Sequence, residues 1–158
     1  MVMKLIKEYM NFERGVDPKH AMGIGQIKKI RKWLDNYKIT DYTINKDLSI
    51  DVNGHVDFRS SAFDMNPFSN FPDFIQFNNV FGFFTIVNKG FTTLKGCPKY
   101  VEFQFCCNRN KLTSLEYCPK EVGDFVCYGN PVLFTVEEIR TRCKINRSIE
   151  IIQDVEIK

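Results

Sequence analysis

Six cysteines and two histidines are the residues of this chain best suited to bind a metal or act as nucleophiles. They stand at Cys97, Cys106, Cys107, Cys118, Cys127 and Cys143, and at His20 and His55. Zinc sites usually contain ligand pairs two to four residues apart, but no C-x-x-C pair occurs here. No Ser-His-Asp, Cys-His or paired-carboxylate arrangement is evident either. We therefore expect reduced thiols, no metal, no cofactor and no enzymatic activity.

Anion binding is a second candidate chemistry, because Gly23-Ile-Gly25 precedes a basic stretch. A single G-x-G without a preceding strand lacks the full spacing of a phosphate-binding loop, so we interpret it as a flexible joint. Apolar residues at three- and four-residue steps then predict an amphipathic helix over residues 24–38. Its basic residues, Lys28, Lys29, Arg31 and Lys32, form either a solvated face or a nucleic-acid site in which Trp33 or Tyr37 stacks on bases.

A repeat with a period of about 21 residues is the clearest pattern in the chain. It aligns Val80 with Val101 and Val122, Phe84 with Phe105 and Phe125, Ile86 with Cys107 and Cys127, and Leu94 with Leu115. The last step is one residue shorter, and a stretched earlier copy over residues 52–63 is offset by 28. The copies fit the pattern L-x-x-L-x-L-x-x-N-x-L, with Val, Phe and Cys in leucine positions. We predict an α/β fold: a short leucine-rich-repeat-like solenoid of about four coils with parallel strands.

Alternation along each short strand divides its residues between the core and the outer face. The aligned Phe and Cys residues are expected to point inward, with Cys107 and Cys127 as small apolar core residues. Asn110 and Asn130 are expected to turn inward and bond backbone groups at the following bend, whereas Ser61 and Lys89 break this ladder. The outward residues form two rows: Asp57, Thr85, Cys106 and Val126, and then Arg59, Val87, Asn108 and Tyr128.

The exposed ends of such a stack need caps, which suggests three regions. Residues 1–46 are predicted to form a helical N-terminal cap, with a weaker first helix over 4–12. Residues 47–134 form the solenoid. Residues 135–158 contain a capping helix that starts at the capping box Thr135-Val-Glu-Glu138 and ends near Cys143. A final strand over 148–157 is expected at the solenoid edge.

The composition is that of a globular protein. The chain has 158 residues, 44% of them hydrophobic, and a net charge of +3. Residues 1–46 contain ten Lys and Arg but only five Asp and Glu, so the N-terminal end is basic. The pI of about 8.5 falls below the value typical of a dedicated nucleic-acid binder. No apolar run approaches a membrane span and no signal peptide is visible, so we expect a soluble, cytoplasmic protein.

The segments Leu112-Thr-Ser-Leu115, Cys118-Pro-Lys120 and Val122-Gly-Asp-Phe125 with Cys127 resemble units of phage and prophage leucine-rich-repeat-like proteins. The resemblance covers about half of the chain and implies no catalytic residues. It implies a phage protein that acts by occupying a host protein. An inhibitor of bacterial defence, such as an anti-CRISPR protein directed at an RNA-guided nuclease, is the role we expect from it.

Two functions from different classes therefore remain open. The first is protein binding on the outward rows, where a preorganised surface costs little ordering entropy. The predicted contact residues are Asp57, Arg59, Thr85, Val87, Cys106, Asn108, Val126 and Tyr128. The alternative is a nucleic-acid-binding accessory protein that uses the basic helix over residues 24–38.

Overall fold

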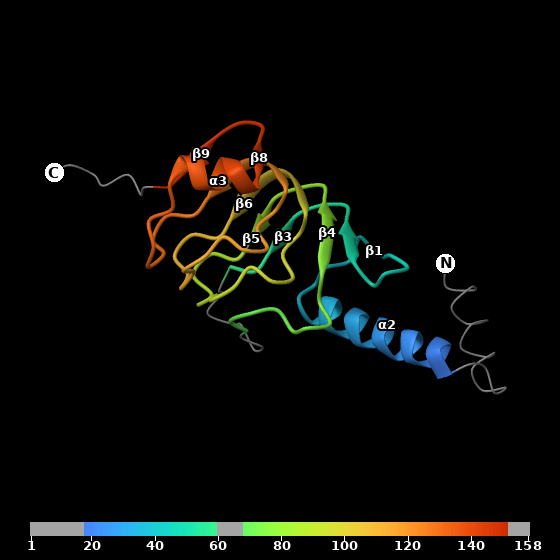
Figure 1. Ribbon diagram of the computed structural model, residues 1–158. Helices are drawn as coiled ribbons and strands as arrows, with labels where there is room; N and C mark the ends of the chain where they lie inside the picture. The colour runs from blue at the N-terminus through green and yellow to red at the C-terminus, as the bar shows by residue number, and fades with distance from the viewer. Residues whose placement is uncertain (1–17, 60–67, 152–158) are drawn as a thin grey trace. The chain divides into compact units, whose positions relative to one another are not determined.

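The computed structural model describes residues 18–59 and 68–151 (Figure 1). The chain divides into two units, residues 1–38 and 39–158. The predicted helix over residues 4–12 lies outside the described residues. Among the described residues, no helix is both long enough and apolar enough to cross a membrane.

A single described helix, α2 (Pro18–Asn36), represents the first unit. It begins earlier than the predicted residue 24 and runs through Gly23 and Gly25, so the interpretation of these glycines as a joint is wrong. The helix continues because the hydrogen-bonded backbone tolerates single glycines at a cost of only about 1 kcal/mol each. Ile30 and Leu34 of the predicted apolar stripe are buried. The assignment of residues 1–46 as a cap stays a prediction.

The second unit is a mixed α/β structure whose main body is a β-solenoid of about three turns. Its strands stand in two rows. The first row contains β2 (Ile50–Val52), β4 (Phe77–Val80), the first residues of β6 (Tyr100–Cys106) and β7 (Glu121–Val126), and β8 (Lys144–Ile145). The second row contains β3 (Val56–Asp57), β5 (Phe84–Thr85), the last residues of β6 and β7, and β9 (Ile149–Glu150). Neighbours in both rows are parallel, as predicted.

Strand β1 (Tyr42–Ile44) differs from the other strands because it pairs antiparallel with β2. It forms the edge of the first row and lies inside the range 1–46 that the sequence assigned to the helical cap. The tight turn at Leu48, which has a positive φ of 68°, joins the two strands. The solenoid unit therefore includes the segment from Ile39 onward.

The predicted register is confirmed strand by strand. Val52 pairs with Val80, Val80 with Val101 and Val101 with Val122, and Phe84 pairs with Phe105 and Phe105 with Phe125. The wider spacing of the stretched earlier copy also holds, because Val56 pairs with Phe84. The register shifts by one between Val101 and Gln104, where β6 has one residue more than β7. The shortened step in the sequence is therefore a local irregularity at the corner between the two rows.

The repeat extends to the backbone conformation at two kinds of turn. Asn88, Arg109 and Gly129 follow the second row in successive coils, and their φ angles are 55°, 56° and 71°. Gly96 and Tyr117 lie in the return segments with φ angles of 92° and 65°. A Cβ at Gly96 would lie 2.8 Å from the carbonyl oxygen of Ile75, so both the conformation and the space favour glycine there. Equivalent residues thus bend the chain at equivalent places.

The C-terminal segment closes the described solenoid with helix α3 (Val136–Arg142) and strands β8 and β9, drawn in orange and red in Figure 1. The Thr135 hydroxyl accepts a bond from the Glu138 N–H, and the Glu138 carboxylate accepts one from the Thr135 N–H. Cys143 is the C-cap residue, so the predicted capping box and helix end are both confirmed. Of the predicted strand over 148–157, β9 is observed; residues 152–158 lie outside the described residues.

Candidate functional site

A groove of about 390 Å³ lies on the outer face of the second strand row. Three strands, β5, β6 and β7, contribute most of its lining together with residues next to them. Two further walls come from Arg59 and from Glu150 of β9. The lining residues are Arg59, Phe83, Thr85, Val87, Gln104, Cys106, Asn108, Val126, Tyr128 and Glu150.

Side-chain alternation in the second row explains why these residues face the groove. Phe84, Phe105 and Phe125 point into the solenoid and are completely buried. The residues on either side of each phenylalanine must therefore point outward. Because the strands are parallel and in register, outward residues of neighbouring strands lie side by side and form continuous rows across the sheet.

Seven of the eight residues predicted to bind a partner line this groove. They are Arg59, Thr85, Val87, Cys106, Asn108, Val126 and Tyr128. The eighth, Asp57, precedes Arg59 and is hydrogen-bonded to it. The structure therefore brings all predicted contact residues together on one face. Their role in binding stays a prediction.

The outward rows are less exposed than their positions suggest. Thr85 and Asn108 are 4% exposed and Val126 is 5% exposed. Val126 stands between Cys106 and Glu150, its register neighbours in β6 and β9. Val87, Cys106 and Tyr128 are half-buried. Val126 therefore faces outward, as predicted, but it lies nearly buried on the floor of the groove.

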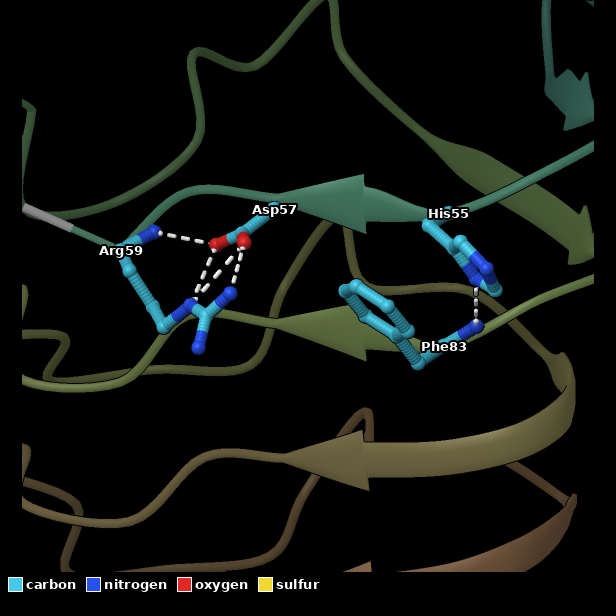
Figure 2. A network of polar contacts seen from close by, with 4 residues as sticks. All are labelled: His55, Asp57, Arg59 and Phe83. Atoms are coloured by element: carbon cyan, nitrogen blue, oxygen red, sulfur yellow. Dashed lines mark hydrogen bonds and ion pairs between the residues drawn. The ribbon is translucent and has the colours of Figure 1, made fainter.

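An ion pair between Asp57 and Arg59 borders one end of the groove (Figure 2). The Arg59 guanidinium donates to both carboxylate oxygens of Asp57, and the Arg59 backbone N–H donates to one of them at 2.9 Å. Partial burial raises the pKa of Asp57, but the hydrogen bonds and positive charge of Arg59 outweigh it and lower the pKa below its ordinary value. Both groups are therefore charged near neutral pH, and they largely neutralise each other.

Two acidic side chains stand near the opposite end of the groove. Asp124 accepts a bond from the Arg147 side chain at 3.1 Å and one from the Ser148 hydroxyl at 2.6 Å. Glu150 lines the groove, and no ion pair or hydrogen bond of its carboxylate occurs within residues 18–59 and 68–151. Glu150 is thus an uncompensated negative charge on the groove wall.

Two polar groups on the groove floor matter for its chemistry. Burial raises the pKa of the Cys106 thiol to about 12, and the Glu150 charge adds to this shift. Cys106 is therefore protonated near neutral pH and is a weak nucleophile. The Thr85 hydroxyl is buried and has no hydrogen-bond partner among the described residues. An unsatisfied buried hydroxyl costs about 1–3 kcal/mol.

Sequence reasoning missed three residues of the lining: Phe83, Gln104 and Glu150. Phe83 and Gln104 precede Thr85 and Cys106 by two residues, so alternation alone was sufficient to find them. Figure 2 shows the Phe83 ring stacked on His55, and the Phe83 N–H donates to His55 Nδ1 at 3.0 Å. Glu150 pairs with Val126 at a spacing wider than the repeat period, so the period did not reveal it.

The alternative basic site lies in the other unit, on α2. Lys28, Lys29 and Lys32 are exposed, whereas Arg31 is half-buried and its Nε has no hydrogen-bond partner among the described residues. The helix therefore presents three lysines to solvent, whereas Arg31, the fourth predicted residue, is less exposed than they are. This arrangement fits a solvated face as well as a phosphate-binding one.

The cysteines occupy positions in or near the core. Cys97, Cys107, Cys118, Cys127 and Cys143 are at most 5% exposed, and burial raises the pKa of each thiol above its ordinary value. The interpretation of Cys107 and Cys127 as core residues is confirmed. In the described part of the chain, no three His, Cys, Asp or Glu side chains cluster in a way that could hold a metal ion.

Comparison with known proteins adds no functional information to this geometry. No family model, no curated protein and no solved structure matches this chain.

Proposed function

We propose that this protein is a non-enzymatic protein-binding protein and that the groove on the second strand row is its contact surface. One observation carries the proposal: seven outward residues selected from the repeat alone line a single groove of about 390 Å³. The half-buried Tyr128 and Val87 supply apolar contact area, the paired Arg59 supplies hydrogen-bond donors at one end and Glu150 supplies charge at the other. Such a mixture is typical of protein interfaces.

The rigidity of the groove favours binding. Its floor consists of hydrogen-bonded parallel strands backed by buried phenylalanines. A surface that is already ordered loses little conformational entropy when a partner binds. The Arg109 guanidinium lies 5.8 Å from the centre of the Tyr128 ring, within the range of a favourable cation–π contact.

We also propose that the solenoid is leucine-rich-repeat-like and has four coils. The 21-residue steps and the inward asparagines support this assignment. Asn110 and Asn130 both bond backbone groups at the bends, which is the role that asparagine has in the L-x-x-L-x-L-x-x-N-x-L pattern. Origin in a phage, and inhibition of a bacterial defence protein such as an RNA-guided nuclease, are narrower proposals that rest only on the sequence resemblance.

Nucleic-acid binding by α2 is the second candidate function. The exposed side chains of Lys28, Lys29 and Lys32 are the observation that favours it. This function predicts a different salt dependence, because phosphate contacts weaken steeply between about 50 and 200 mM salt whereas an apolar interface does not.

A pull-down from bacterial lysate with three baits tests both candidates. The baits are the wild type, the groove variant Val87→Thr/Tyr128→Ala and the helix variant Lys28→Glu/Lys32→Glu. Val126→Asp is unsuitable, because a charge at this 5% exposed position would also destabilise the fold. We expect a protein that the wild type and the helix variant retain at both salt concentrations and that the groove variant loses about tenfold or more. Loss with the helix variant alone, together with captured nucleic acid, would contradict the proposal.

A further inference from the structure

We propose that the groove recognises a basic segment of its partner: a lysine or arginine pairs with Glu150 while apolar neighbours pack on Val87, Val126 and Tyr128. This inference rests on the proposed protein-binding function and names the chemistry of the occupant. It follows from the charges around the groove and from the spacing of the outward rows.

The acidic groups around the groove differ in their partners, and one cation, Arg109, lies against the Tyr128 ring without an ion pair among the described residues. Asp57 is neutralised by Arg59, and Asp124 by Arg147. Only Glu150 among these acidic groups has no cationic partner in the described part of the chain. A basic side chain of an occupant would compensate this charge, whereas an acidic one would be repelled.

Glu150 is positioned by the fold to act on an occupant of the groove. Its backbone carbonyl accepts a hydrogen bond from Cys127 at 3.0 Å, and it lies in register with Val126. Its side chain is therefore on the same outward row as Thr85 and Cys106. Burial raises the pKa of the Cys106 thiol in this row, and the negative charge of Glu150 adds to the shift.

The dimensions of the row fit a short peptide segment. Asp57 and Glu150 are separated by four steps between neighbouring strands. At about 4.8 Å per step the row is about 19 Å long, which about six residues of extended chain would span. The basic residue would lie at the Glu150 end, and the rest of the segment would extend over Val126 toward Thr85.

The unpaired Glu150 also separates a peptide from a nucleic acid as the occupant. Thr85 lies in the middle of the path, but its hydroxyl oxygen is buried, so the choice of occupant does not depend on it. The backbone of an extended peptide is uncharged, whereas the phosphates of a nucleic acid would face the Glu150 carboxylate. A nucleic acid therefore fits the groove less well.

Selection from a displayed library of random 12-residue peptides tests this inference on the full-length chain. The targets are the wild type, Glu150→Lys, and the control Glu116→Lys. Glu116 is exposed and lies outside the groove lining, so it matches the charge change without altering the site. We expect wild type and control to select peptides with a lysine or arginine next to aromatic or aliphatic residues. Glu150→Lys should select peptides with an acidic residue in that place.

Titration of the best wild-type peptide then measures the effect by fluorescence anisotropy. Glu150→Gln should weaken binding about threefold and Glu150→Lys about tenfold, and Val87→Thr/Tyr128→Ala should abolish it. Equal melting temperatures of wild type and Glu150→Gln would show that the loss does not come from unfolding. An unlabelled single-stranded 20-nucleotide DNA should not displace the labelled peptide from the groove.

The possible failures are distinguishable. Peptides that need Val87 and Tyr128 but show no basic preference, or keep it in Glu150→Lys, would overturn the inference and leave the proposed function in place. Peptides that bind the Val87→Thr/Tyr128→Ala variant as well as the wild type would overturn both. Competition by the DNA that depends on Tyr128 would overturn both as well, in favour of nucleic-acid binding.

Discussion

The two halves of the solenoid have the same parallel strand arrangement but different core side chains. The aromatic half (residues 50–59 and 68–95) is filled by Phe58, Phe71, Phe77, Phe84 and Phe91, whose ring centres lie 5.0–6.2 Å apart in most neighbouring pairs. The cysteine half (residues 96–143) places thiols and leucines in its core: Cys97, Cys107, Leu112, Leu115, Cys118 and Cys127. Phe105 and Phe125 continue the aromatic column into the second half.

Strand register does not follow this difference in core side chains. Phe84 pairs with Phe105 and Phe105 pairs with Phe125, although the step along the chain from Val56 to its partner Phe84 is longer than these two steps. Within regular steps the core side chain also changes, because Phe91 of one coil is replaced by Leu112 in the next and both are completely buried. The comparison teaches that strand register is preserved while side chains of different size fill the core to the usual close packing.

Hydrogen bonding at the bends also differs between the halves. Lys89 stands where the cysteine half has Asn110 and Asn130. The amide oxygen of Asn110 accepts bonds from the N–H groups of Lys89 and Phe91, and its amide nitrogen donates to the carbonyls of Ile86 and Cys107. Asn110 therefore satisfies the bend of the preceding coil, in which the ladder asparagine is missing.

The largest effect is expected from the aromatic half. Phe84→Ala should lower the free energy of unfolding by about 4 kcal/mol, because it leaves a cavity among the rings of Phe58, Phe71, Phe77 and Phe105. Cys107→Ala, at an equally buried position of the cysteine half, should cost only about 1 kcal/mol. Urea denaturation measures both. Equal costs would contradict the division into two differently packed halves.

The second largest effect is expected from the side-chain hydrogen bonds of the asparagines at the bends. Asn110→Ala should destabilise by about 3 kcal/mol, because several buried backbone groups lose their partner at once. Asn70→Ala should cost less than about 1 kcal/mol, because the bonds of Asn70 to Thr92 are exposed. Thermal denaturation of both variants makes the comparison. A larger loss for Asn70 would show that the aromatic half has the more important ladder.

Cysteine substitutions test the two faces of the cysteine half. Cys127→Ser should cost about 1–3 kcal/mol, because a hydroxyl would be left in an apolar stack. Cys106→Ser should cost less, since Cys106 is half-buried on the groove face. The free energies of unfolding of the two variants are the relevant measurement. Equal free energies of unfolding would contradict the assignment of Cys127 to the core and of Cys106 to the outer face.

The smallest effect concerns pH at the far end of the cysteine half. Although burial raises the pKa of Asp124, bonds from Ser148 and Arg147 lower it below its ordinary value. The stabilisation is therefore fully present above the unfolded pKa of about 4 and is lost as the pH falls through the lower, folded pKa. Asp124→Asn should reduce the loss of stability between pH 7 and pH 3 by about 1 kcal/mol or less. Thermal denaturation of the wild type and Asp124→Asn at the two pH values makes the comparison.

Most of the solenoid could be predicted from the sequence. The repeat period established the register of Val80, Val101 and Val122, and the alternation within each copy assigned Phe105 to the core and Cys106 to the outer face. Strand β1 escaped prediction because its antiparallel pairing is not part of the repeat. The joint at Gly23 and Gly25 was wrong because helical context outweighs the weak propensity of glycine.

Periodicity by itself therefore determined which residues share a row of this protein, because in-register parallel strands place equivalent positions side by side. The tertiary structure decided how deep the rows lie, since the near-complete burial of Thr85 and Val126 depends on neighbours that come from other coils. It also decided that Glu150 borders the groove and lacks a partner among the described residues. A segment outside the repeat supplies that residue, and only three-dimensional packing brings it to the site.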